Sequence, residues 1–247
     1  MRSVRTTFKI LETVASRQPI GLSELSRTLA MPKSTVQRSL ATLGELDWIR
    51  SDEDSKWVLG AKVSEVGKYL DEVSGLRDAA LSAMGDLHAE TNETIHLSVL
   101  DGRFARLVER YLSTHALRLV KPLGSRAALH AASSGKAILA GMPSSRVEEY
   151  VRGGLPRVTS RTLTDPVAFR VELECVRSRG YAISEQEMED GIVSVAAAIR
   201  APTRRPIAAL AVAVPLTRVD ATTRETLGRM VIAAAEDVEA NLSQRSR

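Results

Sequence analysis

Apolar positions between residues 22 and 49 recur with the spacing of two short helices joined by a tight turn. Ser23 is available as a cap for the first helix. Met31-Pro32 ends that helix, because the residue before a proline is disfavoured in the α region, and Pro32 suits the first position of the next helix. The recurring residues are Leu22, Leu25 and Leu29 in the first helix and Val36, Leu40 and Leu43 in the second. The pattern predicts a helix-turn-helix.

The second helix has a small, polar face opposite its apolar residues. Gln37 and Arg38 on this side are long enough to reach base edges in a major groove. The charged residues from Leu25 to Gly44 are all positive, so none of them repels phosphate. An ordinary helical hairpin with a solvated face is the alternative interpretation. The residues that we expect to face DNA are Lys33, Ser34, Thr35, Gln37, Arg38 and Thr42.

Two short strands around an acidic turn follow the second helix, which is the arrangement of a wing. The acidic tip, residues 52–54, would approach phosphates poorly, so we expect the flanking Arg50 and Lys56 to face DNA. Upstream, an apolar stripe predicts a helix that closes a three-helix core. Its members are Val4, Phe8, Leu11 and Val14 or Ala15. Residues 1–60 are therefore predicted to form a winged helix-turn-helix domain.

Residues 61–75 contain a further amphipathic segment. Its apolar stripe has no evident partner within one chain, so we expect a linker helix that packs against a second copy of itself. The stripe consists of Val63, Val66, Tyr69 or Leu70, and Val73.

Residues 76–247 alternate helical and strand patterns, which predicts a second, α+β domain. Thr164-Asp165-Pro166 has the pattern of a helix start, with Gly180 as the stop. Asp101-Gly102 is a typical tight turn between two strands. The expected strands cover residues 94–100, 103–112, 116–124, 181–184, 193–201 and 206–214, and the expected helices cover residues 76–91, 133–141, 144–152, 166–179 and 220–242.

Composition agrees with a soluble two-domain protein. The chain has 247 residues, 44% of them hydrophobic and 26% charged, and no long apolar run or signal-peptide pattern. The single cysteine, Cys175, offers no disulfide pair and suits a reducing cytoplasm, and we expect no membrane association. The net charge of +4 is modest. Charge alone therefore does not mark the first domain as the DNA-binding one, and the pattern around the second helix has to carry that interpretation.

The chain resembles IclR-family transcriptional regulators over nearly its full length. The segments that carry the resemblance are LSELSRTLAMPKSTVQRSLATLGELDWIR, LHAETNETIHLSVLDG, LHAASSGKAILA, SRTLTDP, RSRGYA, EQEMEDGIVSVAAAIR and PIAALAVAVP. The resemblance implies a winged helix-turn-helix domain, a dimerising linker helix and a GAF-like effector-binding domain. It also implies binding to palindromic double-stranded operators as a homodimer or a dimer of dimers, with a small organic acid as the effector.

The resemblance also implies an effector site in the second domain. Independently, Ser133-Ser134-Gly135 at a helix start offers backbone N–H groups to an anion, although a serine that merely caps the helix is the simpler alternative. The residues carried over position by position are Ser133, Ser134, Ser184, Ile192, Ser194, Ala211 and Ala213, with Ala116, Leu119 and Ala127 as apolar lining. Ala211 and Ala213 stand where the family has strand hydroxyls, and Ser184 where it has a carboxylate. These departures predict a bulkier or aromatic acid instead of glyoxylate or pyruvate.

Signals for catalysis are weak. Cys175 has no nearby histidine, and no phosphate-binding loop occurs. The histidines, His88, His96, His115 and His130, lack metal-ligand spacing, and the acidic residues Glu185, Glu187, Glu189 and Asp190 are interpreted as a solvated loop, with a cation site as the alternative. We expect no catalytic residue, metal or cofactor. The alternatives are a DNA-binding protein without an effector and a DNA-tethered enzyme with an unrecognised site.

Overall fold

The computed structural model describes the backbone of residues 2–201 and 203–245 and, within these ranges, all side chains except those of residues 2, 3, 67–74 and 245. The chain divides into two compact units, residues 1–73 and 74–247. The predicted α+β class, with an N-terminal winged helix-turn-helix followed by a mixed second domain, is confirmed.

The first unit is a three-helix core with a two-stranded wing. Its elements are α1 (Arg2–Arg17), α2 (Leu22–Thr28), α3 (Lys33–Glu45), β1 (Ile49–Ser51) and β2 (Trp57–Leu59). Ser26 Oγ donates to the carbonyl of Met31 at 2.6 Å and holds the turn between α2 and α3. Gly21 precedes α2 without a side-chain cap, so the expected capping role of Ser23 is wrong.

The buried face of α1 differs from the predicted stripe. Ile10 and Val14 are fully buried, whereas Val4 and Phe8 are 60% and 58% exposed. The packed face also carries a polar residue, because Thr7 Oγ1 donates to Ser39 Oγ of α3 at 3.3 Å. Leu11 also packs against this core, so the Leu11 and Val14 part of the predicted stripe is confirmed and only its N-terminal part, Val4 and Phe8, is wrong.

Helix α4 (Ala61–Thr91) is one continuous helix where the sequence pattern predicted a break at Gly75. A glycine inside a helix costs only about 1 kcal/mol relative to alanine, so it does not by itself end one. Val66 in the predicted dimerisation stripe is 41% exposed. The side chains of Tyr69, Leu70 and Val73 lie outside the described residues.

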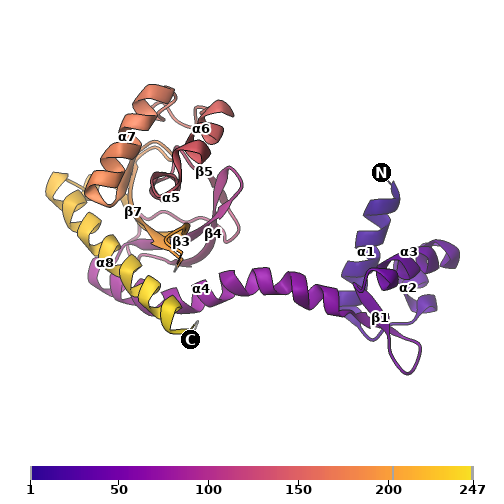
Figure 1. The fold of residues 1–247 in the computed structure, drawn as a ribbon. Helices are drawn as coiled ribbons and strands as arrows, with labels where there is room; N and C mark the ends of the chain where they lie inside the picture. The colour runs from indigo at the N-terminus through magenta and orange to yellow at the C-terminus, as the bar shows by residue number, and fades with distance from the viewer. Residues whose placement is uncertain (1, 202, 246–247) are drawn as a thin grey trace. The chain divides into compact units, whose positions relative to one another are not determined.

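The second unit is built on a six-stranded antiparallel sheet in the order β5-β4-β3-β8-β7-β6. Figure 1 shows α5, α6 and α7 on one face of this sheet and α8 beside the C-terminal half of α4 on the other. The strands are β3 (Thr94–Asp101), β4 (Phe104–Tyr111), β5 (Arg126–Ala128), β6 (Ala182–Glu185), β7 (Ile192–Arg200) and β8 (Pro206–Pro215). The helices are α5 (Ser133–Ala140), α6 (Ser144–Arg152), α7 (Pro166–Arg179), the short η1 (Leu216–Arg218) and α8 (Ala221–Arg245).

Several local signals in this unit are confirmed and one is wrong. Asp165 accepts hydrogen bonds from the first turn of α7, and Gly180 ends that helix with a φ of 84°. The predicted strand over residues 116–124 is instead an irregular loop, and the neighbouring edge strand is only β5. The apolar residues that suggested the strand point into solvent: Leu117, Val120 and Leu123 are 61%, 50% and 54% exposed.

Candidate functional site

The outer face of α3 is available for contact with a partner. Lys33, Ser34, Gln37, Arg38 and Thr42 are exposed, and Thr35 is partly buried. Opposite them, Val36, Leu40 and Leu43 are buried, so α3 has the polarity that the sequence predicted.

The side chains of α3 differ in how free they are. Thr42 Oγ1 donates to the carbonyl of Arg38 at 3.2 Å, which ties this hydroxyl to its own helix. Within the described part of the chain, no ion pair or side-chain hydrogen bond engages the Arg38 guanidinium or the Gln37 amide. These two side chains are therefore the long polar groups that α3 can offer to a groove.

In the wing, the basic residues on either side of the turn are exposed, and the acidic turn is held by hydrogen bonds to its own backbone. The Asp52 carboxylate accepts hydrogen bonds from the backbone N–H groups of Asp54 at 3.1 Å and Lys56 at 2.8 Å. Arg50 of β1 and Lys56, the residue before β2, are both exposed. Lys56 Nζ also lies 3.8 Å from Asp54, a solvent-exposed pair that competes little with a phosphate.

The second unit contains a cavity of about 400 Å³ between its sheet and the start of α5, which we call the α5 cavity. All but two of the predicted effector residues line it. The predicted residues at the cavity are Leu119, Ala127, Ser133, Ser134, Ser184, Ile192, Ser194, Ala211 and Ala213. Ala116 and Gly135 are not among its lining residues.

Strand register explains how residues distant in sequence meet on the cavity floor. Ala213 of β8 pairs with Thr94 of β3 on one side and with Ser194 of β7 on the other. Ser194 in turn pairs with Ser184 of β6. Because residues paired directly across neighbouring strands point to the same face, this row of small side chains forms a floor under α5.

The hydroxyls around the start of α5 connect the helix to the sheet. Ser133 Oγ donates to Ser194 Oγ at 2.9 Å, and Ser184 Oγ donates to the carbonyl of Ala131 at 2.7 Å. The residue before α5 is Ala132, and no side chain caps the helix. The N-cap alternative for Ser133 and Ser134 is therefore wrong. The first backbone N–H groups of α5 have no acceptor within the helix, as at any helix start.

Gly135 has a packing role instead of a lining role. A Cβ at this position would lie 2.3 Å from both the Cα and the carbonyl oxygen of Leu129. Only glycine allows α5 to approach the preceding segment this closely. Gly135 thus fixes where the helix start lies relative to the cavity.

Charged and polar residues that sequence reasoning missed also line the cavity. Lys121 Nζ pairs with Glu189 Oε2 at 2.5 Å and so connects the loop after β4 to the loop after β6. His96 of β3 faces the cavity from the middle of the sheet. Burial, with a smaller effect of the positive charges of Arg110 and Lys121, lowers the pKa of His96 to about 4, so its imidazole is neutral at pH 7. An inward-facing polar position in the strand pattern TIHLSVL was the signal that could have identified His96.

The acidic loop after β6 is more than a solvated loop. Glu187 is only 8% exposed, and its Oε1 lies 2.6 Å from Nζ of Lys136, which is itself 1% exposed. Burial raises the pKa of the Glu187 carboxyl in spite of this partner. Glu185 pairs with Arg224 at 2.9 Å on another side of the loop. The loop is therefore anchored by ion pairs, and no group of three potential metal ligands is found in the described parts of the chain.

The other histidines have structural environments. His130 Nε2 donates to the carbonyl of Pro156 at 2.9 Å, which leaves Nδ1 to accept from the Tyr150 hydroxyl at 2.8 Å. His88 Nδ1 lies 2.9 Å from the carbonyl of Glu93. Cys175 is an exposed free thiol on α7. None of the helices described is long and apolar enough to cross a membrane.

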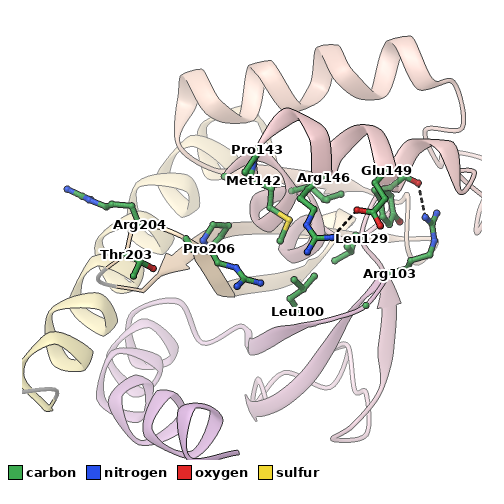
Figure 2. Close-up of a pocket in the computed structure, with 15 residues that line it drawn as sticks. Leu100, Arg103, Leu129, Met142, Pro143, Arg146, Glu149, Thr203, Arg204 and Pro206 are labelled. Atoms are coloured by element: carbon green, nitrogen blue, oxygen red, sulfur yellow. Dashed lines mark hydrogen bonds and ion pairs between the residues drawn. The ribbon is translucent and has the colours of Figure 1, made fainter. Parts of the chain in front are cut away.

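A second cavity, of about 850 Å³, lies at the other end of α5 (Figure 2). Its arginines do not converge on a common point. Arg103 donates to the carbonyls of Tyr150 at 2.8 Å and Gly154 at 2.6 Å, and Arg146 pairs with Glu149 at 2.9 Å. Figure 2 shows the guanidinium of Arg204 pointing away from the others. We therefore take the smaller α5 cavity, whose polar groups surround one space, as the candidate ligand site.

Comparison with known proteins gives a consistent result. Residues 3–53 match the family model described as the IclR helix-turn-helix domain, and residues 67–240 match the one described as Bacterial transcriptional regulator IclR C-terminal. The chain is 31% identical over 243 residues to the Transcriptional repressor IclR of Escherichia coli (strain K12), covering 96% of this chain and 89% of the repressor. It is also 31% identical over 243 residues to HTH-type transcriptional regulator KdgR of the same strain, covering 97% and 92% of the two chains.

Solved structures agree with these relatives. The chain is similar to the crystal structure of the Thermotoga maritima IclR, with a TM-score of 0.68 and 27% identity over 98% of this chain and 99% of that one. An IclR homologue from Microbacterium hydrocarbonoxydans complexed with 4-hydroxybenzoate gives the same TM-score, identity and coverage.

Proposed function

The chain belongs to the IclR family of transcriptional regulators, and on that basis we propose that α3 and the wing bind operator DNA and that a small organic acid in the α5 cavity modulates this binding. The named relatives are transcriptional regulators or repressors, so the chain is a DNA-binding transcriptional regulator and not an enzyme. The alternative of a DNA-tethered enzyme is thereby excluded. Because its target is DNA, we place the protein in the cytoplasm.

For DNA recognition, the proposal assigns base contacts to the two long side chains of α3. Arg38 can make a bidentate contact to guanine and Gln37 to adenine, and both are exposed. Lys33, Arg50 and Lys56 would contact phosphates, which fix orientation without reading sequence. Two copies joined through α4 would place two such helices on half-sites separated by about one or more helical turns.

For effector binding, the observation that carries the proposal is the uncapped start of α5 facing a cavity with an apolar wall. Helix N-termini bind carboxylates through free N–H groups and the positive end of the helix dipole. The effector's carboxylate would therefore lie at Ser133–Gly135. Its body would lie against Leu119, Ile192, Ala211 and Ala213.

The size of the cavity supports an effector larger than a two- or three-carbon acid. A volume of about 400 Å³ falls within the range of pockets that hold ring-sized ligands. Alanines at 211 and 213 leave that volume open and offer no hydroxyl to a small polar acid. The homologue of Microbacterium hydrocarbonoxydans complexed with 4-hydroxybenzoate, an aromatic acid, is consistent with this size.

Calorimetry followed by gel shifts tests the proposal. We expect wild-type protein to bind one or more aromatic acids but not the corresponding amides, because only the acid carries the charge that α5 would hold. A bound acid that changes operator affinity tenfold must favour one DNA-affinity state by about 1.4 kcal/mol. Absence of binding by every aromatic and short aliphatic acid would instead support a regulator without an effector.

A pair of variants separates the cavity from the rest of the second unit. Ala213→Leu places a larger side chain on the cavity floor and should abolish acid binding. Val167→Leu adds a comparable group on α7, where Val167 is 65% exposed, and should leave binding unchanged. Equal binding by both variants would contradict the assignment of the site.

A further inference from the structure

His96 of β3 is part of the cavity floor. It pairs with Ala211 of β8 on one side and with Arg110 of β4 on the other. The residue opposite His96 on the ligand side of the sheet is thus an alanine, which neither fills space nor offers a hydrogen bond. His96 and Ala211 both line the cavity.

The His96 ring has no hydrogen-bond partner among the residues that the structure describes. Its Nε2 atom is buried without a hydrogen-bond partner, and no hydrogen bond to Nδ1 occurs within the described ranges. Buried polar atoms are nearly always hydrogen-bonded, so an orphan of this kind calls for an explanation. A ring that served only to pack could be replaced by leucine without leaving a polar atom unsatisfied.

The other titratable side chains of the cavity wall are already paired. Lys121 pairs with Glu189 at 2.5 Å, and Arg126 pairs with Asp101 at 2.7 Å. His96 is therefore the titratable group left over in the described lining. Because it is neutral at pH 7, it can take part in hydrogen bonds without demanding a charged partner.

The chemistry of a neutral imidazole defines the group that would satisfy it. One ring nitrogen donates and the other accepts, and a hydroxyl can pair with either because it both donates and accepts. A bound group would pair with Nδ1, or with Nε2 after a half-turn of the ring about its Cβ–Cγ bond. A second carboxylate would have to be desolvated against a neutral ring and would find no unpaired cation in the described lining.

We infer that His96 determines effector specificity by requiring a hydroxyl group on the organic acid in addition to its carboxylate. This inference rests on the proposed function, which places the carboxylate at the start of α5. A ring-sized hydroxy acid would then span the cavity, with its carboxylate at the start of α5 and its hydroxyl at His96 of β3.

Binding of benzoate and its three monohydroxylated isomers tests the inference by calorimetry. With wild-type protein, at least one hydroxylated isomer should bind tenfold or more tightly than benzoate, which corresponds to about 1.4 kcal/mol. In His96→Leu this preference should fall to within about twofold, while benzoate binds as in wild type, because leucine keeps the apolar contact and removes only the polar one. His115→Leu, the same substitution on the exposed loop after β4, should retain the preference.

The possible outcomes separate this inference from the proposed function. If no aromatic or aliphatic acid binds the wild type, the effector proposal fails and the role of His96 fails with it. If benzoate and all isomers bind equally, or if His96→Leu keeps the preference, the inference is overturned while the effector site stands. Should His96→Leu fail to fold, His96→Asn serves as the second variant. Asparagine keeps a hydrogen-bond donor and an acceptor on a shorter side chain. Its preference for the hydroxylated isomer over benzoate should be smaller than that of the wild type but should not disappear.

Discussion

Removing one partner of the buried Lys136–Glu187 pair is expected to destabilise the second unit. Lys136 of α5 is 1% exposed and holds the loop after β6 through Glu187 at 2.6 Å, with Glu172 of α7 at 3.6 Å. Lys136→Met keeps the length and apolar stem of the side chain but removes its charge. The change leaves Glu187 buried without a cation, whereas Glu172 keeps Arg179 at 2.8 Å.

The expected loss in the free energy of unfolding depends on the Glu187 carboxylate that Lys136→Met leaves without a partner. Removing one partner of a buried pair costs about 3–5 kcal/mol, because the other charge stays uncompensated. Glu187 can limit this loss by taking up a proton, since burial already raises its pKa, so we expect the lower end, about 3 kcal/mol. Adding Glu187→Gln to Lys136→Met should recover most of the loss. Arg146→Met, which breaks the exposed pair with Glu149, should cost no more than about 1 kcal/mol.

The assay can use the uneven distribution of aromatic residues. Both tryptophans, Trp48 and Trp57, lie in the first unit, so their fluorescence reports on that unit during urea unfolding. Far-ultraviolet circular dichroism reports on both units. Lys136→Met should lower the urea midpoint of the transition seen only by circular dichroism. The midpoint of the tryptophan fluorescence transition should not change. A shift of less than about 1 kcal/mol, or an equal shift in both signals, would refute the reasoning.

The dependence on pH supplies an independent check of the same pair. A carboxyl whose folded-state pKa is raised binds its proton more tightly in the folded protein. Its contribution to stability is present below the unfolded pKa, near 4.5, and is lost as pH rises through the folded pKa. Because Lys136→Met raises the pKa of Glu187 further, its destabilisation should be larger at about pH 8 than at about pH 5. A cost that is independent of pH would show that Glu187 stays ionised or exposed.

Three further variants test the DNA, assembly and effector assignments. Arg38→Ala should weaken binding to the specific operator by about 1–3 kcal/mol in gel shifts at fixed salt, and unchanged affinity in a folded variant would remove Arg38 from the base contacts. Val66→Glu with Tyr69→Glu should lower both the dimer fraction in light scattering and the operator affinity, and a wild-type monomer that binds operator tightly would contradict pairing through α4. Introducing serine at Ala211 and Ala213 should shift calorimetric preference toward smaller, more polar acids, and tighter binding of glyoxylate than of every aromatic acid by wild type would contradict our interpretation of these alanines.

Local signals in the sequence were sufficient for much of the fold. Pro32, Asp165 and Gly180 mark helix boundaries through chemistry that acts over a few residues, and the structure has helix boundaries at all three. The errors arose where packing outweighs local pattern. Phe8 is exposed although it belongs to the apolar stripe of α1, and the loop after β4 is irregular although its apolar residues alternate like those of a strand.

The candidate ligand site shows the same division between local and long-range information. Ser133 and Ser134 could be assigned from sequence, because a helix start is a local property and the family resemblance covers it. His96 could not, since its meaning depends on strand register: it matters that its neighbour on β8 is Ala211 and not a residue with a hydroxyl. A serine at 211 would stand next to the imidazole and could satisfy it, leaving nothing for an effector to supply. In the sequence Ala211 looks like a simple loss of polarity. In the folded sheet it leaves His96, on the adjacent strand, facing the cavity without a hydrogen-bond partner.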